Sequence, residues 1–138
     1  LIIVTQGLLD QVESENELAF VLGHELGHFK NRDHLRALGR GAVLSLFFAA
    51  TTGGDVAGIG INAADITLRG FSRRQESDAD VFGLALVNTE FGHVDSILRF
   101  VTYLSTHPAA GERIADMKNL ARSEGWSVDG EVAPLNWQ

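Results

Sequence analysis

Cysteine is absent from the 138 residues, so the chain has neither a disulfide framework nor a thiolate ligand for zinc. Any metal ion that it binds must be held by histidine and carboxylate side chains. An excess of positive charge is also missing, because the formal net charge is −7 at pH 7. This charge argues against nucleic acid or an anionic lipid surface as the main partner.

A long hydrophobic run is missing as well. A helix that crosses a bilayer needs about 20 apolar residues, and the most apolar stretch, residues 42–50, is interrupted by Thr51-Thr52-Gly53-Gly54. The pattern favours a buried core helix followed by a glycine-rich loop, and the alternative is a membrane-facing or substrate-cleft segment. The chain also lacks an initiator Met and a signal-peptide pattern, which predicts that it is a piece of a longer gene product.

The length suits a single domain over residues 1–138 with a core of its own. A short β-branched run at residues 1–5 predicts a strand. Capping-box patterns predict two long helices, one starting at Ser14 and one at Ser72. A third helix is expected after Asp95 and a fourth from Pro108 to Gly125. The chain is therefore expected to be mainly helical.

An H-E-x-x-H pattern occupies residues 24–28, in the middle of the first long helix. Residues four apart lie on the same face of a helix, so His24 and His28 can present two imidazoles to one metal ion. Glu25 lies one step round the same turn, where it can take a proton from a metal-bound water. Two ligands and a base at this spacing are typical of a zinc hydrolase.

A third ligand must come from another element, because catalytic zinc normally has three protein ligands and a water. Glu76 and Asp80 are the best candidates, since they lie four apart on one face of the second long helix. Glu76 would ligate the metal, and Asp80 would hydrogen-bond a ligand histidine and fix its tautomer. The same two residues also suit a solvated face near a helix N-terminus, and the spacing alone does not separate these interpretations.

Three sequence blocks, in this order, resemble the signature of one family. They are Val21 to His28, Ser72 to Asp80, and Ser105-Thr106-His107-Pro108 followed by Arg113-Ile114. With the lead-in Thr5-Gln6-Gly7-Leu8-Leu9, the chain from position 4 to about 117 resembles the HtpX-like and CAAX-prenyl-protease-like zinc metallopeptidases. These form peptidase family forty-eight, of the gluzincin type.

The resemblance implies a zincin-like domain of the α+β class, mainly α, with an active-site helix, a second ligand-bearing helix and a small edge β-sheet. It implies His24, His28 and Glu76 as the ligands of one zinc ion per chain and Glu25 as the general base. Asp80 would be the partner of a ligand histidine. Extended substrate is expected to lie beside the strand at residues 1–5.

The third block adds two candidates for stabilising an oxyanion, since His107 and Arg113 match the family's H-P-x-x-x-x-R-I pattern. His107 could equally be the polar start of a helix, and Arg113 could form a buried structural ion pair. Tyr103 is a further oxyanion candidate, although a core or rim aromatic is the simpler interpretation. His34 and His93 are predicted to be surface histidines.

The sequence thus predicts a zinc metalloendopeptidase that acts on peptides or proteins in quality control or processing. One alternative is a non-catalytic or latent domain, stabilised by zinc, for binding or chaperone work. Another is a membrane-coupled protease that uses residues 42–50 or segments outside this chain. The resemblance favours a membrane-associated or periplasmic location. However, only the broken stretch 41–68 stands where integral-membrane relatives carry hydrophobic spans, and the upstream edge strand of many relatives is missing.

Overall fold

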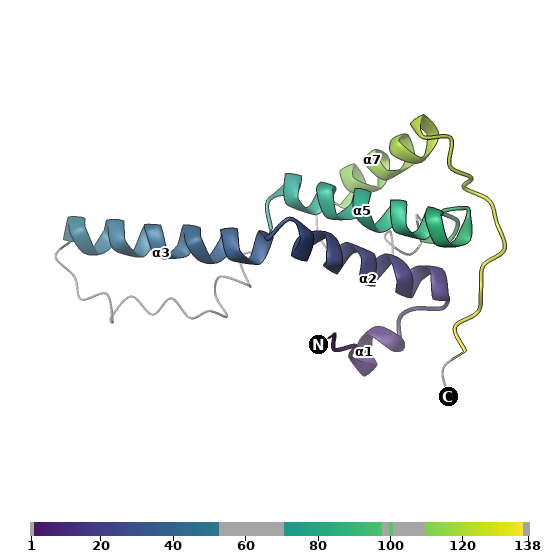
Figure 1. Cartoon of the computed structure of the whole chain (residues 1–138), viewed down its shortest axis with the longest axis horizontal. Coiled ribbons are helices and arrows are strands. Elements are labelled where there is room, and N and C mark those ends of the chain that lie inside the picture. The colour runs from purple at the N-terminus through teal and green to yellow at the C-terminus, as the bar shows by residue number, and fades with distance from the viewer. Residues whose placement is uncertain (1, 53–70, 98–99, 101–109, 137–138) are drawn as a thin grey trace. The chain divides into compact units, whose positions relative to one another are not determined.

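The computed structural model describes residues 2–52, 71–97, 100 and 110–136. Helices dominate this part of the chain, and Figure 1 shows them as α1 (Gln6–Leu9), α2 (Glu15–Lys30), α3 (Asp33–Thr52), α5 (Arg73–Phe91) and α7 (Ala110–Ser123). Strand pairing in the same residues is limited to isolated bridges between Ser14 and Pro134 and between His93 and Ser127. The expectation of a mainly helical protein is therefore confirmed.

Contacts divide the chain into two compact units. The first unit contains Leu1–Gly27 and Ser77–Gln138, and the second contains His28–Glu76. The division falls within α2 and within α5, each of which contributes residues to both units. The single domain over residues 1–138 stays a prediction.

The predicted capping box at Ser72 is present in full, and the one at Ser14 is present with Glu17 reaching the amide of the preceding residue, Glu13. At the start of α2, the Glu17 amide donates to Ser14 Oγ at 3.2 Å, and Glu17 Oε2 accepts from the Glu13 amide at 2.7 Å. At the start of α5, the Ser72 amide donates to Gln75 Oε1 at 2.9 Å, and the Gln75 amide donates to Ser72 Oγ at 3.3 Å. Each box satisfies backbone N–H groups that have no partner within the helix.

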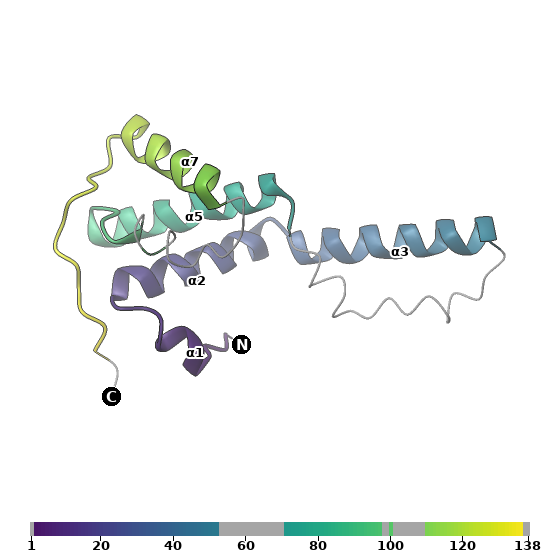
Figure 2. The same ribbon diagram turned by 180° about the vertical axis from the view of Figure 1, so that it is seen from behind.

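The core of the first unit forms where α2, α5 and α7 lie side by side, as both Figure 1 and the reverse view in Figure 2 show. Its buried apolar residues are Val12, Phe20, Leu84, Val87, Val94, Ile97, Phe100, Met117 and Ala121. Glycine lets α2 approach α5 closely, because a Cβ atom at Gly23 would lie 3.0 Å from Gly83 Cα. A Cβ atom at Gly27 would lie 2.9 Å from Ala79 Cα. The close contact between α2 and α5 therefore depends on glycine at these positions, because a larger residue would not fit.

The strand predicted at residues 1–5 is wrong for the part that the structure describes, because residues 2–5 form no strand. Ile2 and Ile3 are 66% and 77% exposed, and Thr5 caps α1 by accepting from the Leu8 amide. A strand needs a partner backbone, and in the described residues none pairs with this segment. The edge sheet is not confirmed. Of the two later helices that the sequence predicted, the fourth is present as α7 from Ala110. The third falls largely on residues 98–99 and 101–109, which lie outside the described part together with Pro108.

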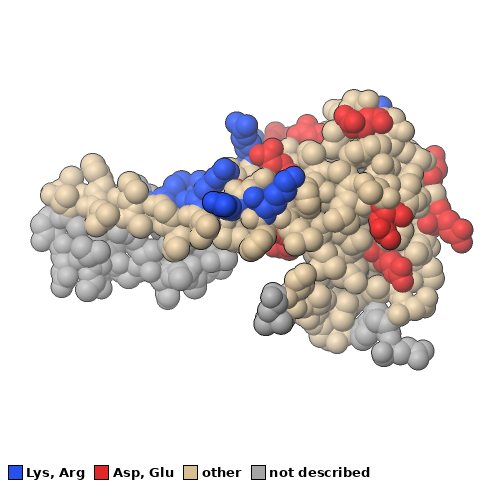
Figure 3. All heavy atoms as spheres, in the orientation of Figure 1, with Lys and Arg blue, Asp and Glu red and all other residues tan. Residues whose placement is uncertain are grey.

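Helix α3, in the second unit, corrects the prediction for residues 42–50. The segment is helical, but its described apolar side chains face solvent, with Val43 66%, Leu46 65% and Phe47 61% exposed. An apolar run is buried only where another layer covers it, which the run itself does not reveal. Basic side chains gather near the start of α3 (Figure 3), where Arg36 and Arg40 border a shallow pocket. Within the described residues, no helix combines the length and apolar character needed to cross a membrane.

Candidate metal centre

Three side chains that could ligate a metal ion come together in the structure. One ligand atom from each of His24, His28 and Glu76 lies within 4.8 Å of the others. In the part of the chain that the structure describes, no other group of three His, Asp or Glu residues converges in this way. These are the three residues that the sequence predicted as ligands. Together they could hold a metal ion.

His24 is held by a carboxylate on α5. Its Nδ1 lies 3.0 Å from Asp80 Oδ1, and Asp80 is only 2% exposed. Arg113 on α7 binds the same carboxylate with two hydrogen bonds, from Nε to Oδ2 at 2.8 Å and from Nη2 to Oδ1 at 2.7 Å. A two-pronged arginine contact fixes the plane of a carboxylate as well as its position. Arg113 therefore fixes the position and plane of the Asp80 carboxylate, and this carboxylate in turn orients the imidazole of His24.

The electrostatics keep Asp80 ionised. Burial disfavours the charged carboxylate, but the hydrogen bonds from Arg113 and His24 outweigh it and hold the pKa below the ordinary value of 3.8. Arg113 forms an ion pair with Asp80, at 2.7 Å between Nη2 and Oδ1, and its role at an oxyanion stays a prediction. When the anionic carboxylate accepts from Nδ1–H of His24, the lone pair of that ring lies on Nε2, the nitrogen left for a metal.

His28 is held in the same way within the second unit, by a residue that the sequence reasoning missed. Its Nδ1 lies 3.0 Å from Oδ2 of Asp33, the first residue of α3, and both side chains are 1% exposed. Gln75 Nε2 donates to the other oxygen of Asp33 at 2.7 Å. The ring of Phe71 stacks on His28, with 4.0 Å between centroids. The other nitrogen of the ring, His28 Nε2, lies 3.7 Å from Glu76 Oε1.

Asp33 is also kept ionised. Burial raises its pKa, but the hydrogen bonds from Gln75 and His28 outweigh this effect and leave the pKa below 3.8. The available signal was an aspartate five residues after His28, at the first position of α3, where helix caps are common. That signal predicts a cap and does not identify a partner for histidine.

The remaining candidates take different places. Glu25 is exposed on α2, in the turn that carries His24, so solvent reaches its carboxylate. His34 is exposed, as predicted, with its ring edge-on to Phe71 at 5.1 Å. His107 and Tyr103 lie outside the described residues.

The prediction for His93 is wrong, because this side chain is 7% exposed. Its Nε2 lies 3.0 Å from the carbonyl oxygen of Glu131, and its Nδ1 accepts from the Asp95 amide at 3.2 Å. The tail packs closely there, since a side chain at Gly130 would collide with the imidazole. His93 therefore joins the C-terminal tail to the end of α5, a long-range contact that local sequence does not reveal.

The sequence matches the model of peptidase family M48 over residues 1–121. The chain belongs to this family. It is 33% identical to a protein named protease HtpX homolog from Desulfatibacillum aliphaticivorans, over 79% of this chain and 43% of that protein. It is 29% identical to a Vibrio cholerae protein whose name describes a beta-barrel assembly-enhancing protease, over 84% of this chain and 30% of that protein. No solved structure matches.

Membership of family M48 and the names of the relatives support a metallopeptidase. The family is generally zinc-dependent, and the donor set of two imidazoles and one carboxylate suits zinc. The non-catalytic alternative is not favoured by these matches, and membrane association gains no support from them or from the described helices. The M48 chain spans less than half the length of each relative.

Proposed function

We propose that this M48 chain carries the zinc site of a metalloendopeptidase, with His24, His28 and Glu76 as the protein ligands. The observation that carries the proposal is the convergence of their ligand atoms within 4.8 Å. Each histidine also has its Nδ1 against a buried carboxylate, and Nδ1–H donation to that carboxylate puts the lone pair of the ring on Nε2. A purely structural zinc site usually has four protein ligands, whereas three leave a position for water.

The reaction we propose is hydrolysis of a peptide bond. A zinc ion held by His24, His28 and Glu76 would supply Lewis acidity, which would polarise the scissile carbonyl and lower the pKa of the attacking water. Glu25 accepts the proton that this water loses and passes it to the nitrogen of the leaving amine. Its exposed position on α2 suits that task, because the carboxylate has access to water.

The supporting residues have a separate role. Asp80 with Arg113, and Asp33 with Gln75, hold the two imidazoles in one tautomer and orientation. Such partners raise the basicity of a ligand histidine and limit the rotation of its ring. Arg113 is a positioning residue in this account, because its guanidinium binds Asp80. The role of His107 in oxyanion stabilisation stays a prediction.

We assign the substrates to the class of proteins undergoing assembly or processing. One relative is named for enhancing beta-barrel assembly, and both relatives are named as proteases. A base and an activated water suit the hydrolysis of a peptide bond, and the names of both relatives as proteases favour this bond over others that such a site could hydrolyse.

The deciding experiment is Glu25→Gln, assayed for cleavage of an unfolded protein and for bound zinc. The amide cannot accept the proton, so we expect cleavage to fall by about 10²–10⁴-fold while zinc is retained. Glu15→Gln is the matched control, because it makes the same change at an exposed position on the same helix. Cleavage by Glu25→Gln at the wild-type rate would remove Glu25 as the base. A wild-type chain that binds zinc and cleaves nothing would instead support a latent domain.

A further inference from the structure

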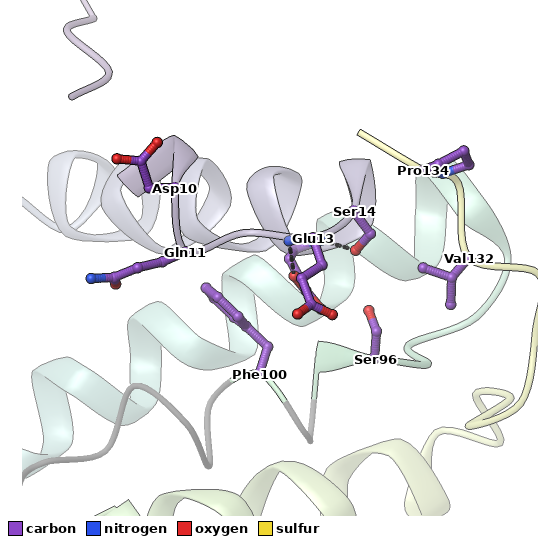
Figure 4. Close-up of a pocket in the computed structure, with 9 residues that line it drawn as sticks. Asp10, Gln11, Glu13, Ser14, Ser96, Phe100, Val132 and Pro134 are labelled. Atoms are coloured by element: carbon purple, nitrogen blue, oxygen red, sulfur yellow. Dashed lines mark hydrogen bonds between the residues drawn. The ribbon is translucent and has the colours of Figure 1, made fainter. Parts of the chain in front are cut away.

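A second pocket lies in the first unit, and none of the proposed metal ligands lines it. Its volume is about 750 Å³, within the range of about 300–1,000 Å³ that is usual for small-ligand sites. Three separate segments form its wall: the linker between α1 and α2 together with the first turn of α2, the residues after α5, and the C-terminal tail (Figure 4). The pocket therefore exists only in the folded chain.

The wall of this pocket is acidic. Asp10, Glu13 and Glu17 all line it, and no lysine or arginine is among its described lining residues. Glu17 is 7% exposed and uses Oε2 to accept from the Glu13 amide. Acidic side chains are also spread over this unit on the face seen in Figure 3. A concave wall with charge of one sign concentrates counter-ions, so the pocket attracts cations.

Ser96 provides an independent sign of a missing ligand. The residue is 5% exposed, and its Oγ has no hydrogen-bond partner among the described residues. Figure 4 shows that this hydroxyl points into the pocket, across from Glu13. Buried hydroxyl groups nearly always have a partner. A donor group of a bound molecule would supply that partner for Ser96.

The ligand class follows from the spacing of the acidic groups. In the described residues, Asp10, Glu13 and Glu17 form no group close enough to share a metal ion, since only the His24, His28 and Glu76 group does so. Spread carboxylates suit an elongated organic cation with several N–H donors. Phe100, 5% exposed, adds an aromatic ring to the same wall, and such rings attract guanidinium and ammonium groups.

We propose that this pocket binds an alkylguanidinium or alkylammonium group, with Asp10 and Glu13 as its counter-charges and Ser96 Oγ as an acceptor. The group is the end of an arginine or lysine side chain of a protein bound by this chain, or a free polyamine. This assignment stands independently of the catalytic one, because none of its residues belongs to the metal centre.

The test is an NMR titration of the ¹⁵N-labelled chain with N-acetyl-arginine-N-methylamide, its neutral citrulline analogue and spermidine. We expect saturable shifts of amides around the pocket, including Glu13 and Val132, with the arginine probe and none with citrulline. Shifts there with spermidine only would assign the pocket to free polyamines. Equal shifts with the citrulline probe, or no shifts there with either cation, would overturn the proposal.

Variants make the test specific to the pocket. Asp10→Asn with Glu13→Gln should weaken binding of the arginine probe by on the order of tenfold or more, because two charge-assisted contacts are lost. Ser96→Ala should weaken it by a smaller factor. Glu90→Gln with Glu124→Gln, which removes two exposed charges elsewhere in the same unit, should leave it unchanged. Equal affinity in the two double variants would show that only the net charge attracts the probe and would overturn the proposal. If the double variant at the pocket does not fold, the single variant Glu13→Gln at an exposed side chain decides.

Discussion

The two histidines that we propose as metal ligands are held in place by different means. In the first unit, His24 is held by Asp80, whose carboxylate is clamped by the charged guanidinium of Arg113. In the second unit, His28 is held by Asp33, which accepts from the neutral amide of Gln75. Arg36 approaches Asp33 only to 3.6 Å, with its side chain 64% exposed. The same task, fixing an imidazole through a buried carboxylate, is thus done once with a charge and once with an uncharged donor.

The difference indicates where each support is vulnerable. Asp33 is fully buried, and its two oxygens serve His28 and Gln75, so it has no access to water that could replace either contact. Asp80 is nearly as buried, but its guanidinium partner is 31% exposed. Water can therefore compensate part of any loss on the His24 side, and little of a loss on the His28 side.

The largest effect is expected for Asp33→Ala. Removing this carboxylate breaks a buried network, which costs about 3–5 kcal/mol in comparable cases. It also frees the His28 ring, so zinc affinity should fall by about 10–100-fold. Urea unfolding and competition with a zinc chelator measure the two quantities. Asp116→Ala, at an exposed site on α7, is the control and should change neither. An Asp33→Ala chain that is as stable as this control would contradict the comparison.

The next effect separates the two arginines. Arg113→Met removes two hydrogen bonds to a buried carboxylate and should destabilise the fold by about 1.5–3 kcal/mol. Arg36→Met removes a long, exposed contact and should cost less than about 1 kcal/mol. The free energy of unfolding of the two variants is the measurement. Equal losses of unfolding free energy in the two variants would mean that the bidentate contact with Asp80 stabilises the fold no more than the exposed contact does.

A smaller effect is expected at the close contact of α2 with α5. Gly27→Ala places a Cβ atom 2.9 Å from Ala79 Cα, next to Asp80, and should cost about 1–3 kcal/mol. Gly39→Ala, in α3, meets no atom within 4 Å and should stabilise by about 0.5–1 kcal/mol through helix propensity. Thermal unfolding of the two variants measures both changes in stability. The sharper test is whether the two changes have opposite signs. A stabilising Gly27→Ala would show that the two helices are not in tight contact.

The smallest effect concerns acid stability of the zinc-free chain. Because the pKa values of Asp33 and Asp80 lie below 3.8 in the folded chain, both carboxylates contribute stability that is fully present above that value. That contribution is lost as the pH falls through their folded pKa values. Urea midpoints between pH 5 and pH 2 should therefore decline less steeply in Asp80→Asn than in the wild type. If the urea midpoint fell equally steeply with pH in Asp80→Asn and in the wild type, protonation of Asp80 would not contribute to acid unfolding.

Local patterns predicted much of the scaffold. The capping boxes at Ser14 and Ser72 depend on residues three positions apart, so the sequence shows both partners. The spacing of His24 and His28 is equally local, because one helical turn sets it. These signals were sufficient to indicate α2 and α5 and to select the residues that converge in the structure.

Features that depend on distant contacts were missed. Asp33 is identified as a support only by its contact with Gln75, which lies 42 positions along the chain. His93 is buried where the C-terminal tail packs against it, and Val43, Leu46 and Phe47 are exposed although they lie in an apolar run. The sequence of a short segment does not show which distant residues will contact it in the folded chain.

The central claim is that Glu76 completes a zinc site with His24 and His28. It is tested most directly by the zinc content of the wild type, Glu76→Ala and Glu90→Ala, each purified without added metal. Glu90 is an exposed glutamate on the same helix and is the matched control. The account predicts one zinc ion per chain in the wild type and in Glu90→Ala, and a large loss in Glu76→Ala. Undiminished zinc in Glu76→Ala, or none in the wild type, would contradict it.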